Sequence, residues 1–175
     1  MPPPLNAAAR LGIAYRPATD ADLPFLALVY ASTRLEEVAQ SGWPPETQRQ
    51  FLAHQFDAQH RHYRQHYPAA EWLVIEREGI AAGRLYVEEW PDQIRLIDIA
   101  LLPDHRGGGA GSAILSDLME MAAAADKPLT IHVEKNNPAM RLYRRLGFTP
   151  IDEHGVYDLM EWKPGERHPG ESRDP

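Results

Sequence analysis

A cluster of glycines stands at Pro103-Asp104-His105-Arg106-Gly107-Gly108-Gly109-Ala110-Gly111-Ser112, between an apolar run and a segment with helical spacing. Glycine lets a backbone come close to a ligand, and the free N–H groups at a helix N-terminus attract anions. With Arg106 beside them, these donors suit a diphosphate. The stretch therefore predicts an anion-binding loop between a strand and a helix.

Two common phosphate-binding motifs do not fit this loop. A P-loop would carry Lys and then Ser or Thr after its second glycine, and no lysine follows here. A dinucleotide fingerprint read from Gly107 would put Ser112 where glycine or alanine belongs, and no acidic residue is evident after a following strand. The remaining alternative is a flexible loop that binds nothing.

Hydrophobic periodicity and turn residues predict the elements on both sides of the loop. Strands are expected near residues 13–16, 72–75, 82–88, 94–102, 129–133, 148–152 and 156–162. Helices are expected from Thr19 or Asp20 onward, over about 46–66, over about 109–125, and over about 138–146, where Gly147 fits a C-cap. This order predicts a mixed α/β (α+β) layer fold.

The chain is expected to form one domain over residues 12–163, with mobile tails at 1–11 and 164–175 that bury no apolar surface. It has no cysteine, no apolar run of membrane-spanning length and no basic-then-apolar leader pattern, which predicts a cytoplasmic protein without disulfides. The formal charge of −7 argues against a nucleic-acid partner and mildly favours a cationic one, although it also serves solubility. We expect no membrane partner and no metal.

A second motif follows at Val133–Phe148, where Asn137-Pro138-Ala139 precedes Leu142-Tyr143-Arg144-Arg145-Leu146-Gly147-Phe148. Together with Arg106–Gly111, read as Arg/Gln-x-x-Gly-x-Gly/Ala, it resembles the signature of the GNAT superfamily of N-acetyltransferases. The approach Ile99-Ala100-Leu101-Leu102-Pro103 is similar as well. The resemblance spans about residues 97–148.

The resemblance implies a twisted mixed sheet of about seven strands with four helices and a V-shaped opening between the fourth and fifth strands. It implies an acetyltransferase that moves an acetyl group from acetyl-CoA to a primary amine, in a family where homodimers are common. The backbone N–H groups of residues 107–111 would cradle the CoA diphosphate, and the strand through Ile99 and Leu101 would bind the pantetheine arm. Gly108 departs from the pattern, since many members carry a cation there. The implied cofactor-binding residues are Ile99, Leu101, Arg106, Gly107, Gly108, Gly109, Ala110, Gly111, Ser112, Asn136 and Asn137.

Tyr143 is the predicted catalytic residue for the leaving group, because a phenol can protonate or stabilise the departing thiolate. Packing between helix and sheet is the alternative role. His132 is the first candidate for the base that takes the amine proton, and its alternative is a hydrogen-bonded residue on the sheet surface. Either asparagine can bind the pantetheine or cap the following helix, and Asn137 is slightly favoured as ligand.

Five acidic residues are further candidates as base or acceptor contacts, with a solvated surface as the alternative. They are Glu36, Glu37, Glu88, Glu89 and Asp98. Trp43, Phe51, Phe56, Tyr63 and Tyr67 fit an aromatic acceptor pocket or core packing equally well.

The absence of cysteine excludes a thiol acyl-enzyme, so direct attack in a ternary complex is the simplest mechanism. The alternatives are a CoA-binding sensor or partner module without turnover, and an acyltransferase that uses a longer acyl-CoA. The sequence does not identify the acceptor.

Overall fold

A computed structural model describes residues 2–165 and shows seven strands in one mixed sheet of order β1-β2-β3-β4-β5-β7-β6. The strands are β1 (Ile13–Pro17), β2 (Glu71–Arg77), β3 (Ile80–Glu89), β4 (Ile94–Leu101), β5 (Leu129–Glu134), β6 (Thr149–His154) and β7 (Tyr157–Trp162). All neighbours pair antiparallel except β4 and β5, which are parallel. The predicted mixed α/β fold is confirmed.

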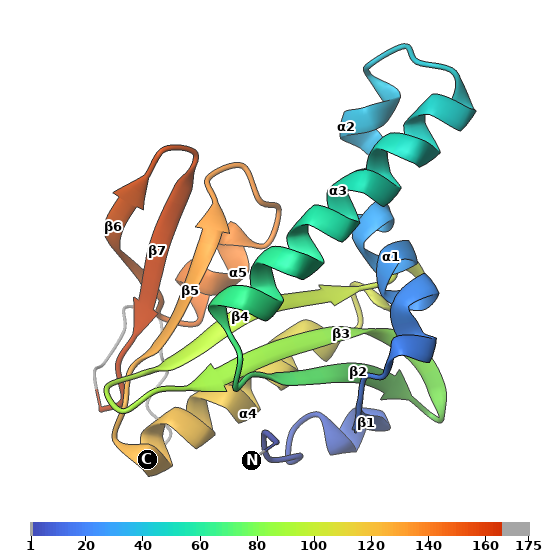
Figure 1. Cartoon of the computed structure of the whole chain (residues 1–175). Coiled ribbons are helices and arrows are strands. Elements are labelled where there is room, and N and C mark those ends of the chain that lie inside the picture. Colours follow the sequence, from blue (N-terminus) through green and yellow to red (C-terminus); the bar gives the residue numbers. More distant parts are fainter. Residues whose placement is uncertain (1, 166–175) are drawn as a thin grey trace.

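Helices cover both faces of the sheet (Figure 1). The α-helices are α1 (Leu23–Ser32), α2 (Leu35–Ala39), α3 (Pro45–His66), α4 (Ala110–Ala125) and α5 (Met140–Arg145). α4 and α5 contribute to one core with apolar residues of β1–β5 and β7. α1, α2 and α3 contribute to a second core, which reaches the sheet at Val74, Tyr86 and Ile97. The sheet is therefore buried from both sides.

The described chain has five α-helices where four were expected, because the first predicted helix is broken after Ser32. The hydroxyls of Ser32 and Thr33 donate to the carbonyls of Val29 and Tyr30, at 2.6 and 2.7 Å. Such back-bonding competes with regular helix hydrogen bonds. α2 therefore starts separately, and Glu36 and Glu37 lie on it.

The N-terminal segment differs from the expected mobile tail that buries nothing. The Asp117 carboxylate on α4 accepts the backbone N–H groups of Asn6, Ala7 and Ala8, at 3.1, 2.8 and 3.0 Å. Ala8 and Asp117 are both fully buried. Sequence patterning missed this contact because it depends on one aspartate far along the chain. Most of the predicted C-terminal tail, residues 166–175, lies outside the described residues.

The parallel pair β4–β5 is short. Over the described residues it joins only Ile94–Leu96 to Leu129–Ile131, although β4 continues to Leu101. Beyond Leu96 the two strands diverge, which leaves the β5-facing backbone groups of β4 without a strand partner. This is the V-shaped opening expected between the fourth and fifth strands.

Candidate active site

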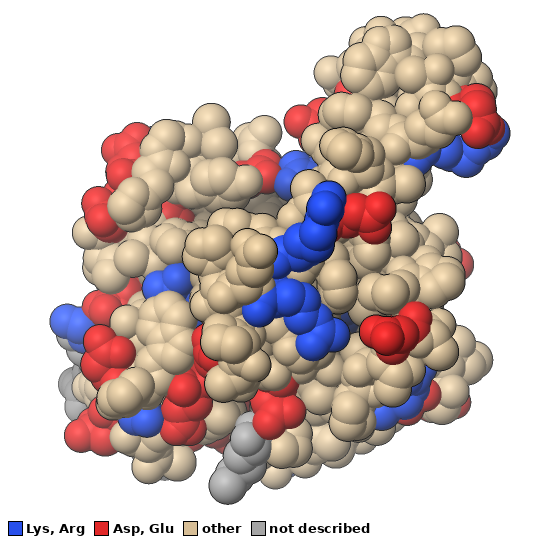
Figure 2. All heavy atoms as spheres, in the orientation of Figure 1, with Lys and Arg blue, Asp and Glu red and all other residues tan. Residues whose placement is uncertain are grey.

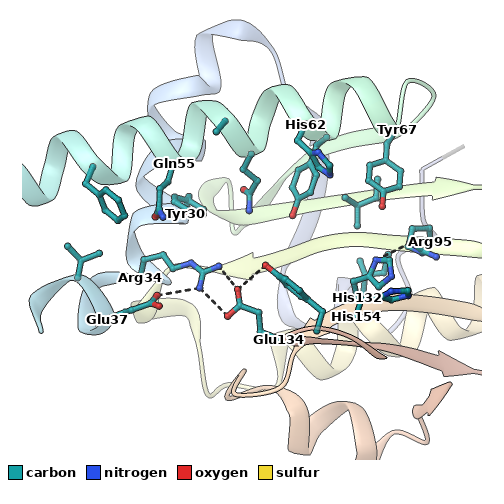
Figure 3. Close-up of a pocket in the computed structure, with 18 of the residues that line it drawn as sticks. Tyr30, Arg34, Glu37, Gln55, His62, Tyr67, Arg95, His132, Glu134 and His154 are labelled. Carbon is teal, nitrogen blue, oxygen red and sulfur yellow. Dashed lines mark hydrogen bonds and ion pairs between the residues drawn. The ribbon is translucent and has the colours of Figure 1, made fainter. Parts of the chain in front are cut away.

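A cleft with a volume of about 930 Å³ lies at the diverging strands. One wall comes from α1, α2 and α3, the other from β5, β6 and β7, and β4 contributes Arg95, Leu96 and Ile97 between them. Figure 2 shows the molecule hollowed between the arm formed by α2 and α3 and the block formed by β6 and β7. Figure 3 shows α3 along one side, facing His132, Glu134 and His154 on the other.

Aromatic side chains line much of this cleft. Trp43, Phe51, Tyr63 and Tyr67 are among its lining residues, whereas Phe56 is buried in the core with Leu52. Four of the five predicted aromatic residues therefore line the cleft, and Phe56 packs in the core.

The glycine loop connects β4 to α4 through a short 3-10 turn at Pro103–His105. Gly107 and Gly109 have left-handed backbone angles, with φ of 78° and 81°, and nothing lies within 4 Å of where their Cβ atoms would be. Only glycine adopts this conformation without strain. Gly109 is the N-cap of α4, so the free N–H groups of the first turn adjoin an open, side-chain-free loop.

Arg106 does not reach over this loop. Its Nε donates to the Leu101 carbonyl at 2.7 Å and its Nη2 to the Ser32 hydroxyl at 3.3 Å. The side chain thus joins the end of β4 to the end of α1. The Ala110 side chain is buried in the core, so only its backbone can meet a ligand.

Tyr143 lies on α5 and is buried, with its ring edge-on to Phe148 at an interplanar angle of 72° and a centroid distance of 5.6 Å. Burial, with a smaller contribution from the Asp98 carboxylate, raises the pKa of its hydroxyl well above the usual value of 10.0. The phenol therefore keeps its proton at neutral pH and can act as a donor.

His132 lines the cleft from β5, next to Arg95 and His154. Its pKa is lowered from 6.5, first by burial and then by the charges of Arg95 and His154. Arg95 Nη1 lies 3.4 Å from its Nδ1, and a guanidinium can only donate. A neutral ring that accepts at Nδ1 carries its proton on Nε2, so Nδ1 is the basic nitrogen. Arg95 must leave Nδ1 before this nitrogen can take a proton from the amine.

Asp98 is already engaged by other side chains. It accepts from the buried guanidinium of Arg84 at 2.7 Å and from the Tyr63 hydroxyl at 3.2 Å. Tyr63 lies on α3 and Arg84 on β3, so these contacts favour a role of Asp98 in holding α3 to the sheet.

The four glutamates do not form a common site. Glu37 lines the cleft, whereas Glu36 is exposed and is not a lining residue. Glu88 is buried and accepts from the Ala69 N–H and the Trp90 indole, and Glu89 pairs with Lys127. Both lie where β3 pairs with the start of β4, at the end of β4 away from the glycine loop.

A sequence model described as the Acetyltransferase (GNAT) family matches residues 33–148, which is more than half of the chain. The chain belongs to this family. A protein of Bacillus subtilis named as a candidate ribosomal protein bS18-alanine N-acetyltransferase is 32% identical over 85 residues, covering 47% of this chain and 56% of that protein. The mycothiol acetyltransferase of Corynebacterium aurimucosum is 33% identical over 89 residues, covering 49% of this chain and 26% of that protein. These alignments thus span about half or less of the relatives' own length.

Solved structures share the GNAT fold. The PaiA N-acetyltransferase of Thermoplasma acidophilum, solved in complex with coenzyme A, matches with a TM-score of 0.64 at 16% identity, covering 86% of this chain and 98% of that one. An acetyltransferase of Thermus thermophilus matches with a TM-score of 0.63 at 18% identity, covering 87% of this chain and 97% of that one.

The two asparagines before α5 differ in their contacts in this GNAT domain. Asn137 Oδ1 accepts the Ala139 N–H at 2.8 Å, a local turn contact just before α5, whose N-cap is Ala139 and has no side-chain cap. The side chain of Asn136 is exposed, and within residues 2–165 no hydrogen bond holds its amide. A ligand role for either residue stays a prediction.

One ion pair of the GNAT domain was not singled out from the sequence. The Arg34 guanidinium donates to both carboxylate oxygens of Glu134, at 3.2 and 2.7 Å, and so connects the α1–α2 junction to the end of β5 across the cleft (Figure 3). Glu134 lies in the second motif, but no pattern in the sequence pairs it with Arg34, which is 100 residues away.

Among residues 2–165, no three His, Asp or Glu side chains gather as a group that could hold a metal ion. The described helices include none that is long and apolar enough to cross a membrane. On the face drawn in Figure 2, acidic side chains gather over β6 and β7, and basic ones form a short group over α3.

Proposed function

We propose that this GNAT domain transfers an acetyl group from acetyl-CoA to a primary amine, by direct attack of the amine in a ternary complex. The observation that carries the proposal is the opening between β4 and β5, which begins past Leu96, beside the cleft, on the strand that ends at the glycine loop. The domain would extend over residues 12–163, and residues 6–8 before it would be attached to it through Asp117.

The residues present fit a CoA thioester. The loop around Gly107 and Gly109 offers main-chain N–H groups with no side chain in the way, and the first turn of α4 adds its dipole. Past Leu96, β4 has no strand partner on its β5 side, and apart from the Leu101 carbonyl, which accepts from Arg106, the backbone groups there can hydrogen-bond the pantetheine amides and polarise a carbonyl oxygen. Acetyl-CoA supplies the activated acyl group, a thioester with a thiolate as leaving group.

Tyr143 would act on that leaving group. Its raised pKa keeps the hydroxyl protonated, and the buried ring belongs to the core against which Ile99 and Leu101 of the diverging part of β4 pack. A donor at this position stabilises the charge that develops on the sulfur as the C–S bond breaks.

His132 is the proposed acceptor of the amine proton, directly or through water. Because its pKa is lowered, the ring is neutral at pH 7, as a base must be. The contact with Arg95 implies that the amine, or a water beside it, replaces the guanidinium at Nδ1 when the acceptor binds.

The cleft is proposed to take the acceptor. Its charged lining is balanced, with Arg34 and Arg95 against Glu37 and Glu134, and its aromatic residues offer apolar surface. This lining favours an acceptor whose amine is next to apolar groups, and it disfavours a highly charged polycation.

Calorimetry with CoA, followed by initial rates with acetyl-CoA and an amine panel, tests the proposal. We expect saturable CoA binding, release of free CoA that depends on an amine, and intersecting double-reciprocal lines. Parallel lines would contradict direct attack, and binding without turnover on any amine would favour a non-catalytic CoA-binding module.

A further inference from the structure

Neither of the two loop positions where a cation could face the diphosphate, 106 and 108, provides one. Gly108 has no side chain, and the guanidinium of Arg106 is held by Leu101 and Ser32 instead of facing the loop. A diphosphate gains much of its binding energy from charge-assisted hydrogen bonds, so a loop of glycines alone is an incomplete site.

Arg77, the last residue of β2, lies beside this gap. A Cβ placed on Gly108 would be 3.5 Å from its Nη1 and 3.8 Å from its Nη2. The guanidinium therefore sits in van der Waals contact with the space that a side chain at position 108 would begin to fill.

The strand pattern shows that this arginine is out of the ordinary. Leu73 and Ile75 alternate onto the α4 face of β2 and are buried in the core there, and Arg77 follows at the same spacing, opposite Ile13 of β1. Arg77 is only partly buried, at the end of β2, so its guanidinium is accessible to a ligand at the loop.

No partner is found within residues 2–165: no ion pair or side-chain hydrogen bond holds the Arg77 guanidinium. It lies instead near the N-terminal end of α4, where the helix dipole is positive and a cation is unfavourable. Two positive features side by side without a counter-charge suit an anion between them.

We infer that Arg77 is a coenzyme-binding residue that supplies from β2 the cation missing at Gly108, and that it contacts the diphosphate of the bound CoA. This inference rests on the proposed function. It adds to it a ligand contact that lies outside both sequence motifs.

The test compares the Kd of CoA, 3′-dephospho-CoA and pantetheine for the wild-type chain, Arg77→Ala and Arg77→Gln. Loss of a hydrogen bond to a charged group corresponds to roughly a tenfold or greater rise in Kd. We expect that rise for CoA and equally for dephospho-CoA, and no change for pantetheine. A rise that disappears with dephospho-CoA would overturn the assignment to the diphosphate and place Arg77 on the 3′-phosphate.

Two further variants sharpen the test. The backbone of Gly108 is outside the left-handed region, so an arginine is tolerated there, and Gly108→Arg in the Arg77→Ala background should recover CoA affinity. Arg49→Ala removes the same charge from an exposed position near the start of α3 and should leave the Kd unchanged. The apo Arg77→Ala chain should melt no earlier than the wild type, because it loses a cation near the helix N-terminus.

The outcomes separate the inference from the function beneath it. Wild-type chain that does not bind CoA would end the proposed function itself. Wild-type chain that binds CoA, with both Arg77 variants binding equally well, would overturn only the inference.

Discussion

At the scale of single residues, Tyr143 carries the proposed chemistry. Replacing it with Phe keeps the ring that packs on Phe148 and removes only the hydroxyl. We expect kcat to fall roughly 10²- to 10⁴-fold, the range for a lost general acid, with the Kd of CoA unchanged. Steady-state rates and calorimetry on the same preparation check this, and an unchanged kcat would leave Tyr143 with a packing role.

His132 gives a pH-dependent prediction. A base must be unprotonated, and its pKa is lowered from 6.5, so kcat/KM should be full at pH 7 and fall as pH drops through that lowered pKa. In His132→Gln this acid limb should disappear and the remaining rate should be low.

His154→Gln is the matched control for His132. The two rings are 5.7 Å apart, and the charge of His154 is one cause of the lowered pKa of His132. Removing it should move the acid limb toward higher pH without abolishing activity. A limb that persists unchanged in His132→Gln would assign the base elsewhere.

At the scale of elements, β3 and β4 approach closely at Gly83. A Cβ there would be 2.2 Å from the Ala100 carbonyl oxygen and 3.1 Å from the Leu101 Cα, both backbone atoms. Gly83→Ala should therefore displace the part of β4 proposed to bind pantetheine. We expect a loss of roughly 1–3 kcal/mol in urea unfolding and a higher Kd for CoA.

Gly79→Ala separates strain from crowding. Gly79 has a φ of 80° in the β2–β3 turn, and nothing lies within 4 Å of its Cβ position. Its substitution should cost only the left-handed strain, about 1–2 kcal/mol, and leave CoA binding intact. Equal CoA affinities for the two alanine variants would argue against a role of β4 in binding.

The N-terminal segment and α4 form a second element-scale unit through Asp117. Asp117→Ala would leave three backbone N–H groups without their acceptor, one of them in the fully buried Ala8. We expect a loss of roughly 2–4 kcal/mol in the free energy of unfolding. Glu120→Ala, which removes an exposed contact of the same helix to Asn6, should change it by less than about 0.5 kcal/mol.

At the scale of the whole molecule, the Arg34–Glu134 pair connects the two walls of the cleft. The exposed fractions of the two side chains are 26% and 24%, so the pair is only partly screened by solvent. A double-mutant cycle of Arg34→Gln and Glu134→Gln should give a coupling free energy of about 1 kcal/mol. Each of the two substitutions should also raise the KM of the acceptor more than the Kd of CoA.

The Arg34–Glu134 pair also makes the free energy of unfolding depend on pH, through the carboxylate of Glu134. Its pKa is lowered from 4.5, first by the hydrogen bond from Arg34. The stability it contributes is fully present above that ordinary value and is lost as pH falls through the lowered one. In Glu134→Gln this loss on acidification should be smaller, and an identical pH profile would show that the pair does not connect the walls.

Sequence patterns are sufficient to predict the order of the strands along the chain, the glycine loop and the helix that carries Tyr143. Each of these follows from local periodicity, glycine chemistry or a motif of adjacent residues. The sequence also indicated where β4 ends, since Pro103 and the glycines cannot continue a strand.

Which polar side chains contact one another depends on the packing of the whole molecule. The approach of Arg77 to Gly108, the Arg34–Glu134 pair and the capture of residues 6–8 by Asp117 join positions far apart in the chain. The same packing turned Arg106 away from the loop and set Asp98 against Arg84. Hydrophobic patterning specifies which face of an element is buried, but the partner of a polar side chain depends on how whole elements pack, and that is fixed only when the sheet and its helices come together.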